Sequence, residues 1–97
     1  MIKSFKDKVT SDLFHGISSS RVQRLPTQIL ESALYKLDIL NAAATLDDLR
    51  FPPGNRLEAL SGRYKSYYSI RINAQWRMIF RWQDSNVYDG TIVDYHK

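Results

Sequence analysis

The residues best suited to chemistry lie in the second half of the chain, where arginines alternate with apolar and aromatic residues. Arg71 falls in the run YSIRIN, and Arg77 and Arg81 fall in the run WRMIFRW. Alternate residues of a β-strand point to the same face, and a guanidinium presents a planar fork of donors that matches phosphate oxygens. The spacing predicts a rigid phosphate-binding face, with Arg77 as the first candidate to hold a reacting phosphate and Arg71 beside it.

A second reactive group closes the chain, in the order Asp94, Tyr95, His96. An imidazole has an ordinary pKa of about 6.5, which suits general acid–base catalysis near neutral pH. Tyr95 could stack on a base or assist proton transfer, although a strand tyrosine facing the core fits the pattern nearly as well. Asp94 is expected to orient a neighbour or to balance charge. A penultimate histidine is by itself usually an ordinary tail residue, so the interpretation depends on these neighbours.

Phosphate-binding arginines beside proton-transferring groups suit the cleavage of RNA. RNA supplies its own nucleophile, the 2′-hydroxyl, so an enzyme has to align it, remove its proton, stabilise the charged phosphorane and protonate the leaving oxygen. The chain has two histidines, His15 and His96, no cysteine, and no cluster with the spacing of metal ligands. We therefore expect no metal and no cofactor, and a structural or surface role for His15.

Four more side chains are candidates for contacts with RNA or for the chemistry. Arg56 could bind phosphate or pair with Glu58, and Glu58 could be a base or only the partner of that ion pair. For Arg81 and Arg63, which are also candidate RNA-binding residues, ordinary solvated arginines are the more plausible alternative.

Charge is distributed unevenly along the chain. Residues 1–49 carry six Lys or Arg and six acidic residues, which cancel, whereas residues 50–97 carry eight Lys or Arg against four acidic residues. Six of those eight cations are Arg. A focused positive surface attracts polyanions, although a solvated basic face is an equally good interpretation of charge alone. The net charge of +4 is too low for pervasive phosphate contact, which disfavours a structural RNA-packaging protein.

The length and composition indicate an ordinary globular protein. The 97 residues are enough for one domain, residues 1–97, with a single modest core. The absence of cysteine excludes disulfides and thiolate zinc sites. No apolar stretch is long enough for a signal peptide or a membrane helix, so the expected location is the cytoplasm, without membrane contact.

The hydrophobic pattern changes from helical to strand-like spacing near the middle of the chain. Pro26 suits the first turn of a long helix that runs to about Ala44, because apolar residues recur at helical spacing from Ile29 to Leu40. The other expected elements are an edge strand at residues 2–5, a short helix at 6–15 stopped by Gly16, a break or N-cap at 18–20, a helical turn at 46–49 and a loop at 52–55.

Register follows from keeping one face of each strand apolar. A three-residue loop at residues 73–75 pairs Ile72 with Trp76 and Arg71 with Arg77, and a turn at 84–86 leads to a last strand at 87–95. The two arginines then lie side by side on the solvent face. Like charges opposed across strands are unfavourable, so an anion is expected between them.

The expected fold class is α+β. N-terminal helices pack on one face of an antiparallel sheet of about four strands, and the other face stays open. The shared apolar positions of the third strand are assigned to the core, namely Trp76, Met78, Phe80 and Trp82.

Several segments, in this order, resemble the HigB branch of the RelE toxin superfamily. They are the opening MIKSF, PPGNRLEALSG at residues 52–62, YSIRIN at 68–73, QWR at 75–77 and VDYH at 93–96. The resemblance covers nearly the whole chain. It implies a compact RelE-like fold and metal-independent cleavage of mRNA in the ribosomal A site, which inhibits translation and growth. It also implies inhibition by a HigA-type helix-turn-helix antitoxin, with operator DNA bound only through the toxin–antitoxin complex.

The chain departs from the family in the segment at residues 57–62. Some HigB proteins carry a catalytic His and Lys there, where this chain has Glu58 and Ser61. The resemblance thus leaves two possibilities open. The protein is either an endoribonuclease that uses Glu58 or His96 for proton transfer, or a catalytically weak or inactive RNA-binding protein that acts mainly with its helix-turn-helix antitoxin in operon autoregulation.

Overall fold

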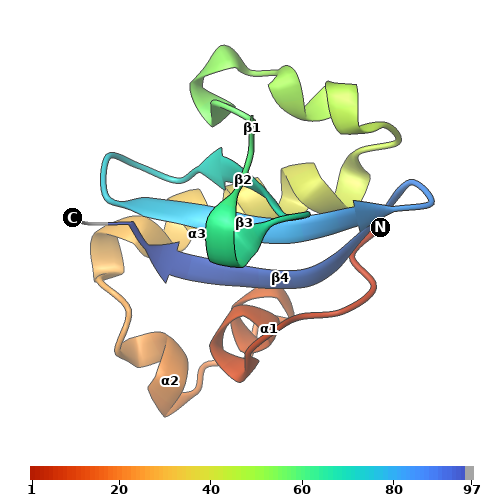
Figure 1. Cartoon of the computed structure of the whole chain (residues 1–97). Helices are drawn as coiled ribbons and strands as arrows, with labels where there is room; N and C mark the ends of the chain where they lie inside the picture. Colours follow the sequence, from red (N-terminus) through yellow and green to blue (C-terminus); the bar gives the residue numbers. More distant parts are fainter. Residues whose placement is uncertain (96–97) are drawn as a thin grey trace.

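A four-stranded antiparallel sheet forms the centre of the molecule. The computed structural model describes residues 1–95. The strands follow one another in the sheet in their chain order, β1-β2-β3-β4 (Figure 1). Their bounds are Glu58–Ala59 for β1, Tyr68–Arg71 for β2, Trp76–Gln83 for β3 and Asn86–Asp94 for β4.

Three α-helices precede the sheet: α1 at Lys8–Phe14, α2 at Ser20–Gln23 and α3 at Thr27–Ala42. Helix α3 runs behind the sheet in Figure 1, and α1 and α2 lie beside β4. The core contains Ile29, Leu37 and Leu40 from α3 with Met78 and Phe80 from β3, and Trp76 and Trp82 pack against it. The expected α+β architecture is confirmed, and the long helix ends two residues before the predicted boundary near residue 44.

Residues 1–95 also contain three short 3-10 helices: η1 at Leu46–Arg50, η2 at Pro53–Asn55 and η3 at Gly62–Tyr64. The segment of residues 2–5 differs from its prediction. It makes two isolated parallel bridges to β4, Ile2 with Val87 and Phe5 with Gly90, rather than a regular edge strand. Four backbone hydrogen bonds join residues 1–6 to Val87 and Gly90 of β4. Between them the Ser4 hydroxyl accepts a hydrogen bond from the Asp89 backbone N–H at 2.9 Å.

The predicted register of β2 and β3 is confirmed. Arg71 lies opposite Arg77. The three-residue loop is held by Asn73, whose Oδ1 accepts hydrogen bonds from the backbone N–H groups of Gln75 and Trp76, both at 2.8 Å. An Asn side chain that bonds to the backbone two and three residues onward stabilises a tight turn, which explains the odd loop length.

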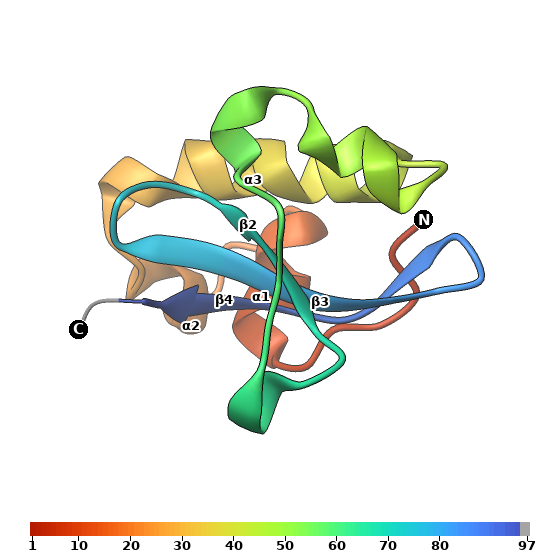
Figure 2. The same cartoon turned by 45° about the horizontal axis from the view of Figure 1, so that its top comes forward.

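The second face of the sheet is not open, contrary to the prediction. Ser69 and Ile79 have no exposed surface, and Thr91 is 5% exposed. In Figure 2 the chain that leads into β1 crosses in front of the central strands. Tyr67, which follows η3, contacts Arg81 of β3, and the Lys6 ammonium lies 5.2 Å from the centre of the Tyr67 ring. The cover could not be read from periodicity, because it comes from a segment with little regular structure.

Candidate functional site

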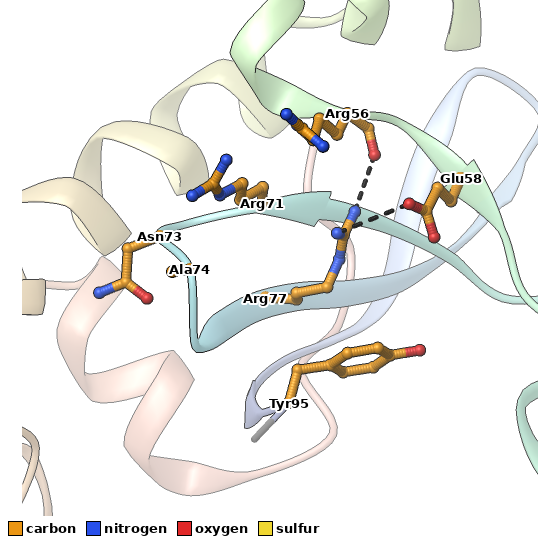
Figure 3. Close-up of a pocket in the computed structure, with 7 residues that line it drawn as sticks. All are labelled: Arg56, Glu58, Arg71, Asn73, Ala74, Arg77 and Tyr95. Atoms are coloured by element: carbon orange, nitrogen blue, oxygen red, sulfur yellow. Dashed lines mark hydrogen bonds and ion pairs between the residues drawn. The ribbon is translucent and has the colours of Figure 1, made fainter. Parts of the chain in front are cut away.

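A pocket of about 300 Å³ lies at the end of the sheet where the β2–β3 loop meets the end of β4. It is lined by Arg56, Glu58, Arg71, Asn73, Ala74, Arg77 and Tyr95 (Figure 3). Three of these side chains are guanidinium groups and one is a carboxylate. The lining therefore has an excess of positive charge, which favours an anionic ligand such as a phosphate.

Arg77 is at the centre of the pocket and is fixed by its neighbours. Its Nε donates to Ser69 Oγ at 2.9 Å, and its Nη2 donates to the Arg56 carbonyl oxygen at 2.7 Å. Its Nη1 lies 3.7 Å from Glu58 Oε1. The residue is only 9% exposed, so its predicted place on an open solvent face is wrong. Arg56 and Glu58, which come from the crossing segment, account for this burial, and they hold the guanidinium in one orientation.

The Arg56 backbone turns sharply at the rim of the pocket. Arg56 follows η2 and adopts the left-handed conformation, with φ of 47° and ψ of 57°. Its carbonyl oxygen thereby faces Arg77, while its side chain lines the pocket (Figure 3). Within residues 1–95 the ion pair of Glu58 is made with Arg77. The predicted pairing of Glu58 with Arg56 is not among the contacts of those residues.

Arg71 and Tyr95 also line the pocket. Arg71 lies across the strand pair from Arg77, as predicted. Tyr95 is 39% exposed, and the centre of its ring lies 5.7 Å from the Arg77 guanidinium carbon. The alternative of a core-facing Tyr95 is therefore wrong. An exposed ring beside three guanidinium groups can stack on a base whose phosphate those groups bind.

The remaining predicted residues lie outside the pocket or outside the described chain. Asp94 lies opposite Trp76 in the sheet and accepts a hydrogen bond from Gln75 Nε2 at 3.1 Å, so it contacts the β2–β3 loop. Arg81 bonds to Asp89 at 2.7 Å, and this contact, followed by the interaction with Tyr67, raises the pKa of Arg81. Arg63 is exposed and lies 5.7 Å from the centre of the Tyr64 ring. His96 is not among the described residues.

Two buried polar residues next to the pocket were missed by the sequence analysis. Lys36 of α3 is 9% exposed, and its ammonium donates to Oδ1 of Asn55, which has no exposed surface. Burial, and secondarily the positive charge of Arg71, lower the pKa of Lys36. A signal was available, because Lys36 occupies a position on the apolar stripe of the helix, three residues after Ala33. Nothing in the pattern indicated its partner.

The described residues contain neither a candidate metal site nor a helix that could span a membrane. Among residues 1–95 no group of three or more His, Cys, Asp or Glu side chains is arranged to hold a metal ion. In the same residues no helix has both the length and the apolar character needed to cross a membrane.

Comparison with known proteins places the chain in a family. A family model described as the RelE-like toxin of the type II toxin–antitoxin system HigB matches residues 3–96. The chain is 42% identical over 97 residues to Toxin HigB-1 of Vibrio cholerae, covering 100% of this chain and 99% of the relative. It is 31% identical over 97 residues to Endoribonuclease HigB of Proteus vulgaris, covering 99% of this chain and 100% of the relative.

Solved structures show the same fold at lower sequence identity. A chain of the YoeB–YefM toxin–antitoxin complex from Staphylococcus aureus superposes with a TM-score of 0.60 at 14% identity, covering 100% of this chain and 99% of that one. A YafQ variant from E. coli gives a TM-score of 0.60 at 14% identity, covering 97% of this chain and 93% of that one. The family match over residues 3–96 and the two HigB relatives show that the chain belongs to the HigB-like, RelE-family toxins of type II toxin–antitoxin systems.

Proposed function

We propose that this toxin is an endoribonuclease that cleaves mRNA in the ribosomal A site without a catalytic metal, and so inhibits translation and growth. The observation that carries the proposal is Arg77, which is nearly buried and held by Ser69 and the Arg56 carbonyl in a pocket with two more guanidinium groups. A charge fixed in advance stabilises a transition state without reorganising during the reaction. The name of the Proteus vulgaris relative, Endoribonuclease HigB, supports the same reaction class.

In this proposal the pocket holds the scissile phosphate while the RNA supplies the nucleophile. The 2′-oxygen forms a bond to phosphorus, the bond from phosphorus to the 5′-oxygen breaks, and a 2′,3′-cyclic phosphate and a 5′-hydroxyl result. Arg77 and Arg71 bind the phosphate oxygens and the charge that develops on them. Tyr95 stacks on a base or assists proton transfer. His96 accepts the 2′-hydroxyl proton or protonates the 5′-oxygen, and Asp94 orients the end of the chain.

The proposed RNA contacts divide into two groups by position. Arg56 lines the pocket with Arg71 and contacts the phosphates nearest the cleaved bond. Arg63 and Arg81 lie outside the pocket, so in this proposal they contact flanking nucleotides or ribosomal RNA. Substitution of these two arginines would weaken RNA binding and reduce its dependence on salt concentration, with little change in the cleavage rate at saturating substrate.

The experiment uses purified toxin and ribosomes programmed with a defined mRNA. Mg²⁺ is held at the level that keeps the ribosomes intact, and transition metals are removed by chelation. We expect discrete cuts within codons whose 5′ fragments end in a 2′,3′-cyclic phosphate. A 2′-deoxy nucleotide placed immediately before the cleaved bond should abolish the cut at that bond. Cleavage that survives the 2′-deoxy substitution, or that needs an added transition metal, would exclude this mechanism.

The proposed partner is a HigA-type helix-turn-helix antitoxin, with operator DNA contacted only through the complex. Membership of a type II toxin–antitoxin family supports this assignment, and the structural relative from Staphylococcus aureus was solved as a toxin–antitoxin complex. Cleavage of mRNA would place the protein in the cytoplasm.

The second candidate function is a catalytically weak RNA-binding protein that acts mainly in operon autoregulation. The observation in its favour is Glu58, an acidic residue in the pocket 3.7 Å from Arg77. Expression of the toxin alone distinguishes the two candidates. Growth arrest that depends on Arg77 supports the enzyme, whereas operator binding in complex without growth arrest supports the weak binder.

Glu58→Gln is expected to change single-turnover cleavage by less than about tenfold. Carboxylates are weak bases at neutral pH. The side chain of Glu58 is 55% exposed and lies beside the Arg77 guanidinium, so in the proposed mechanism the RNA phosphate replaces Glu58 as the partner of Arg77. Gln keeps the shape and the hydrogen-bonding capacity. Glu31→Gln, at an exposed position of α3, is the matched control. A loss of a thousandfold or more in folded Glu58→Gln would instead identify the carboxylate as the general base.

A further inference from the structure

Lys36 is buried at a position of α3 where the helix otherwise presents apolar residues to the core. Ile29, Ala33, Leu37 and Leu40 share its buried stripe, and none of them is more than 1% exposed. A buried ammonium loses its hydration, which is unfavourable unless a specific partner compensates. The lowered pKa of Lys36 reflects this burial. An apolar side chain would avoid the penalty, so the ammonium is explained by what it binds.

The partner of Lys36 is Asn55, which ties the segment between α3 and β1 into a closed loop. Asn55 Oδ1 accepts from the Lys36 ammonium. Its Nδ2 donates to two backbone carbonyl oxygens, those of Leu49 at 3.1 Å and Phe51 at 3.0 Å. The amide of a fully buried side chain is thus engaged through both its oxygen and its nitrogen, and these bonds connect residues 49–55 to α3.

The next residue in the chain is Arg56, and its backbone contacts the centre of the pocket. A left-handed conformation is uncommon for a residue with a Cβ atom and persists only where the surroundings enforce it. That conformation directs the Arg56 carbonyl oxygen to Arg77 Nη2 at 2.7 Å (Figure 3). A continuous series of contacts therefore runs from Lys36 through Asn55 and the Arg56 backbone to Arg77.

We propose that Lys36 and Asn55 are positioning residues for the cleavage pocket. Their buried hydrogen bond holds Arg56 in its left-handed conformation, and the Arg56 carbonyl in turn orients the Arg77 guanidinium toward the phosphate. Lys36 also lies close enough to Arg71, which lines the pocket, for their charges to interact. The inference rests on the proposed function, since it assigns how that pocket is kept in its reactive shape.

The test compares Lys36→Met, which keeps the length and apolar stem but removes the ammonium, with Lys36→Arg, which keeps a cationic donor. Leu37→Val is the matched control, because it removes buried volume from the adjacent position of the helix without touching Asn55. Unfolding temperatures are measured first, and cleavage is then followed well below the lowest of them. The single-turnover cleavage rate at saturating ribosome–mRNA complex and the apparent KM are determined separately for each variant.

Lys36→Met is expected to lower the saturated single-turnover rate about tenfold, because a small displacement of a catalytic group costs this much or more in rate. Lys36→Arg should stay within about threefold of the wild type, and Leu37→Val should keep the wild-type rate even where it lowers the unfolding temperature as much. A Lys36→Met protein that is less stable but cleaves at the wild-type saturated rate would overturn the proposal. If Lys36→Met does not fold, Lys36→Gln takes its place under the same criteria.

A second readout separates this inference from the proposed function. The Arg77 Nε–H, which donates to Ser69, can be followed by ¹⁵N nuclear magnetic resonance in the isolated protein. Its resonance should shift, and its exchange with solvent should accelerate, in Lys36→Met but not in Leu37→Val. An unchanged Arg77 resonance in Lys36→Met would overturn the positioning role whether or not the protein cleaves RNA. A wild-type protein without ribonuclease activity would overturn the function and leave the resonance comparison decisive for the positioning.

Discussion

Arg77→Ala is expected to lower single-turnover cleavage of ribosome-bound mRNA by about 10²–10³-fold, the usual effect of removing one fixed charge that stabilises a transition state. Arg77 is the pocket residue held by two hydrogen bonds and by an ion-pair contact, so its guanidinium is already oriented before RNA arrives. Rapid-quench kinetics at saturating ribosomes measure this effect. Growth arrest on expression of the variant without antitoxin should be lost in parallel.

Folding has to be controlled in this experiment, because alanine leaves buried partners behind. Without the guanidinium, Ser69 Oγ and the Arg56 carbonyl lose their donor, at a cost of about 1–3 kcal/mol in the free energy of unfolding. Arg77→Lys keeps the charge but not the planar fork, and we expect an intermediate rate. Arg50→Ala is the matched control, because Arg50 is exposed and pairs with Asp47. A folded Arg77→Ala protein that cleaves within tenfold of the wild type would exclude Arg77 from the chemistry.

Removal of His96 and Lys97 is expected to lower the cleavage rate by about 10²–10⁴-fold, the usual contribution of general acid–base catalysis. His96 directly follows Tyr95, which lines the pocket and whose ring centre lies 5.7 Å from the Arg77 guanidinium carbon. The residue that precedes His96 is therefore already at the proposed phosphate site. The point variant His96→Gln should reproduce most of this loss. It should also flatten the dependence of the rate on pH around the ordinary imidazole pKa of about 6.5.

Two single variants serve as controls for the truncation. His15→Ala removes the other histidine, whose ring bonds to the Ser11 carbonyl oxygen at 2.8 Å and packs on Phe14, and it should leave cleavage unchanged. Lys97→Ala tests whether the last charge matters by itself. If the truncated protein cleaves at the wild-type rate, the proton acceptor is Glu58 or a group on the ribosome.

The arrangement of the strands could be derived from the sequence because it follows from local rules. The apolar side chains of Tyr68, Ile70 and Ile72 can share a face with the apolar residues that alternate along β3 only when the loop between the two strands has three residues. The structure confirms that loop and the pairing of Arg71 with Arg77. The long helix was predictable for the same reason, since its buried stripe repeats at helical spacing.

The environment of the same arginines could not be derived in this way. Alternation predicts which face a side chain takes, but not what later covers that face. The hydrogen bond from Arg77 to the Arg56 carbonyl joins residues 21 positions apart, and the bond from Lys36 to Asn55 joins residues 19 apart. Both depend on the path of the irregular segment between α3 and β1, for which no periodic pattern exists.

The sequence by itself determined the family, the α+β fold, the strand register and a cluster of arginines next to the end of the chain. These properties are carried by residue type and spacing, which local physical preferences translate directly into structure. Only the tertiary structure decided that Arg77 is buried rather than exposed, that Tyr95 faces the pocket, and that Lys36 belongs near it. The physical reason is that burial and partner choice depend on which distant segments meet, and here the segment from Leu49 to Glu58 brings a helix lysine and a strand arginine into one hydrogen-bonded unit.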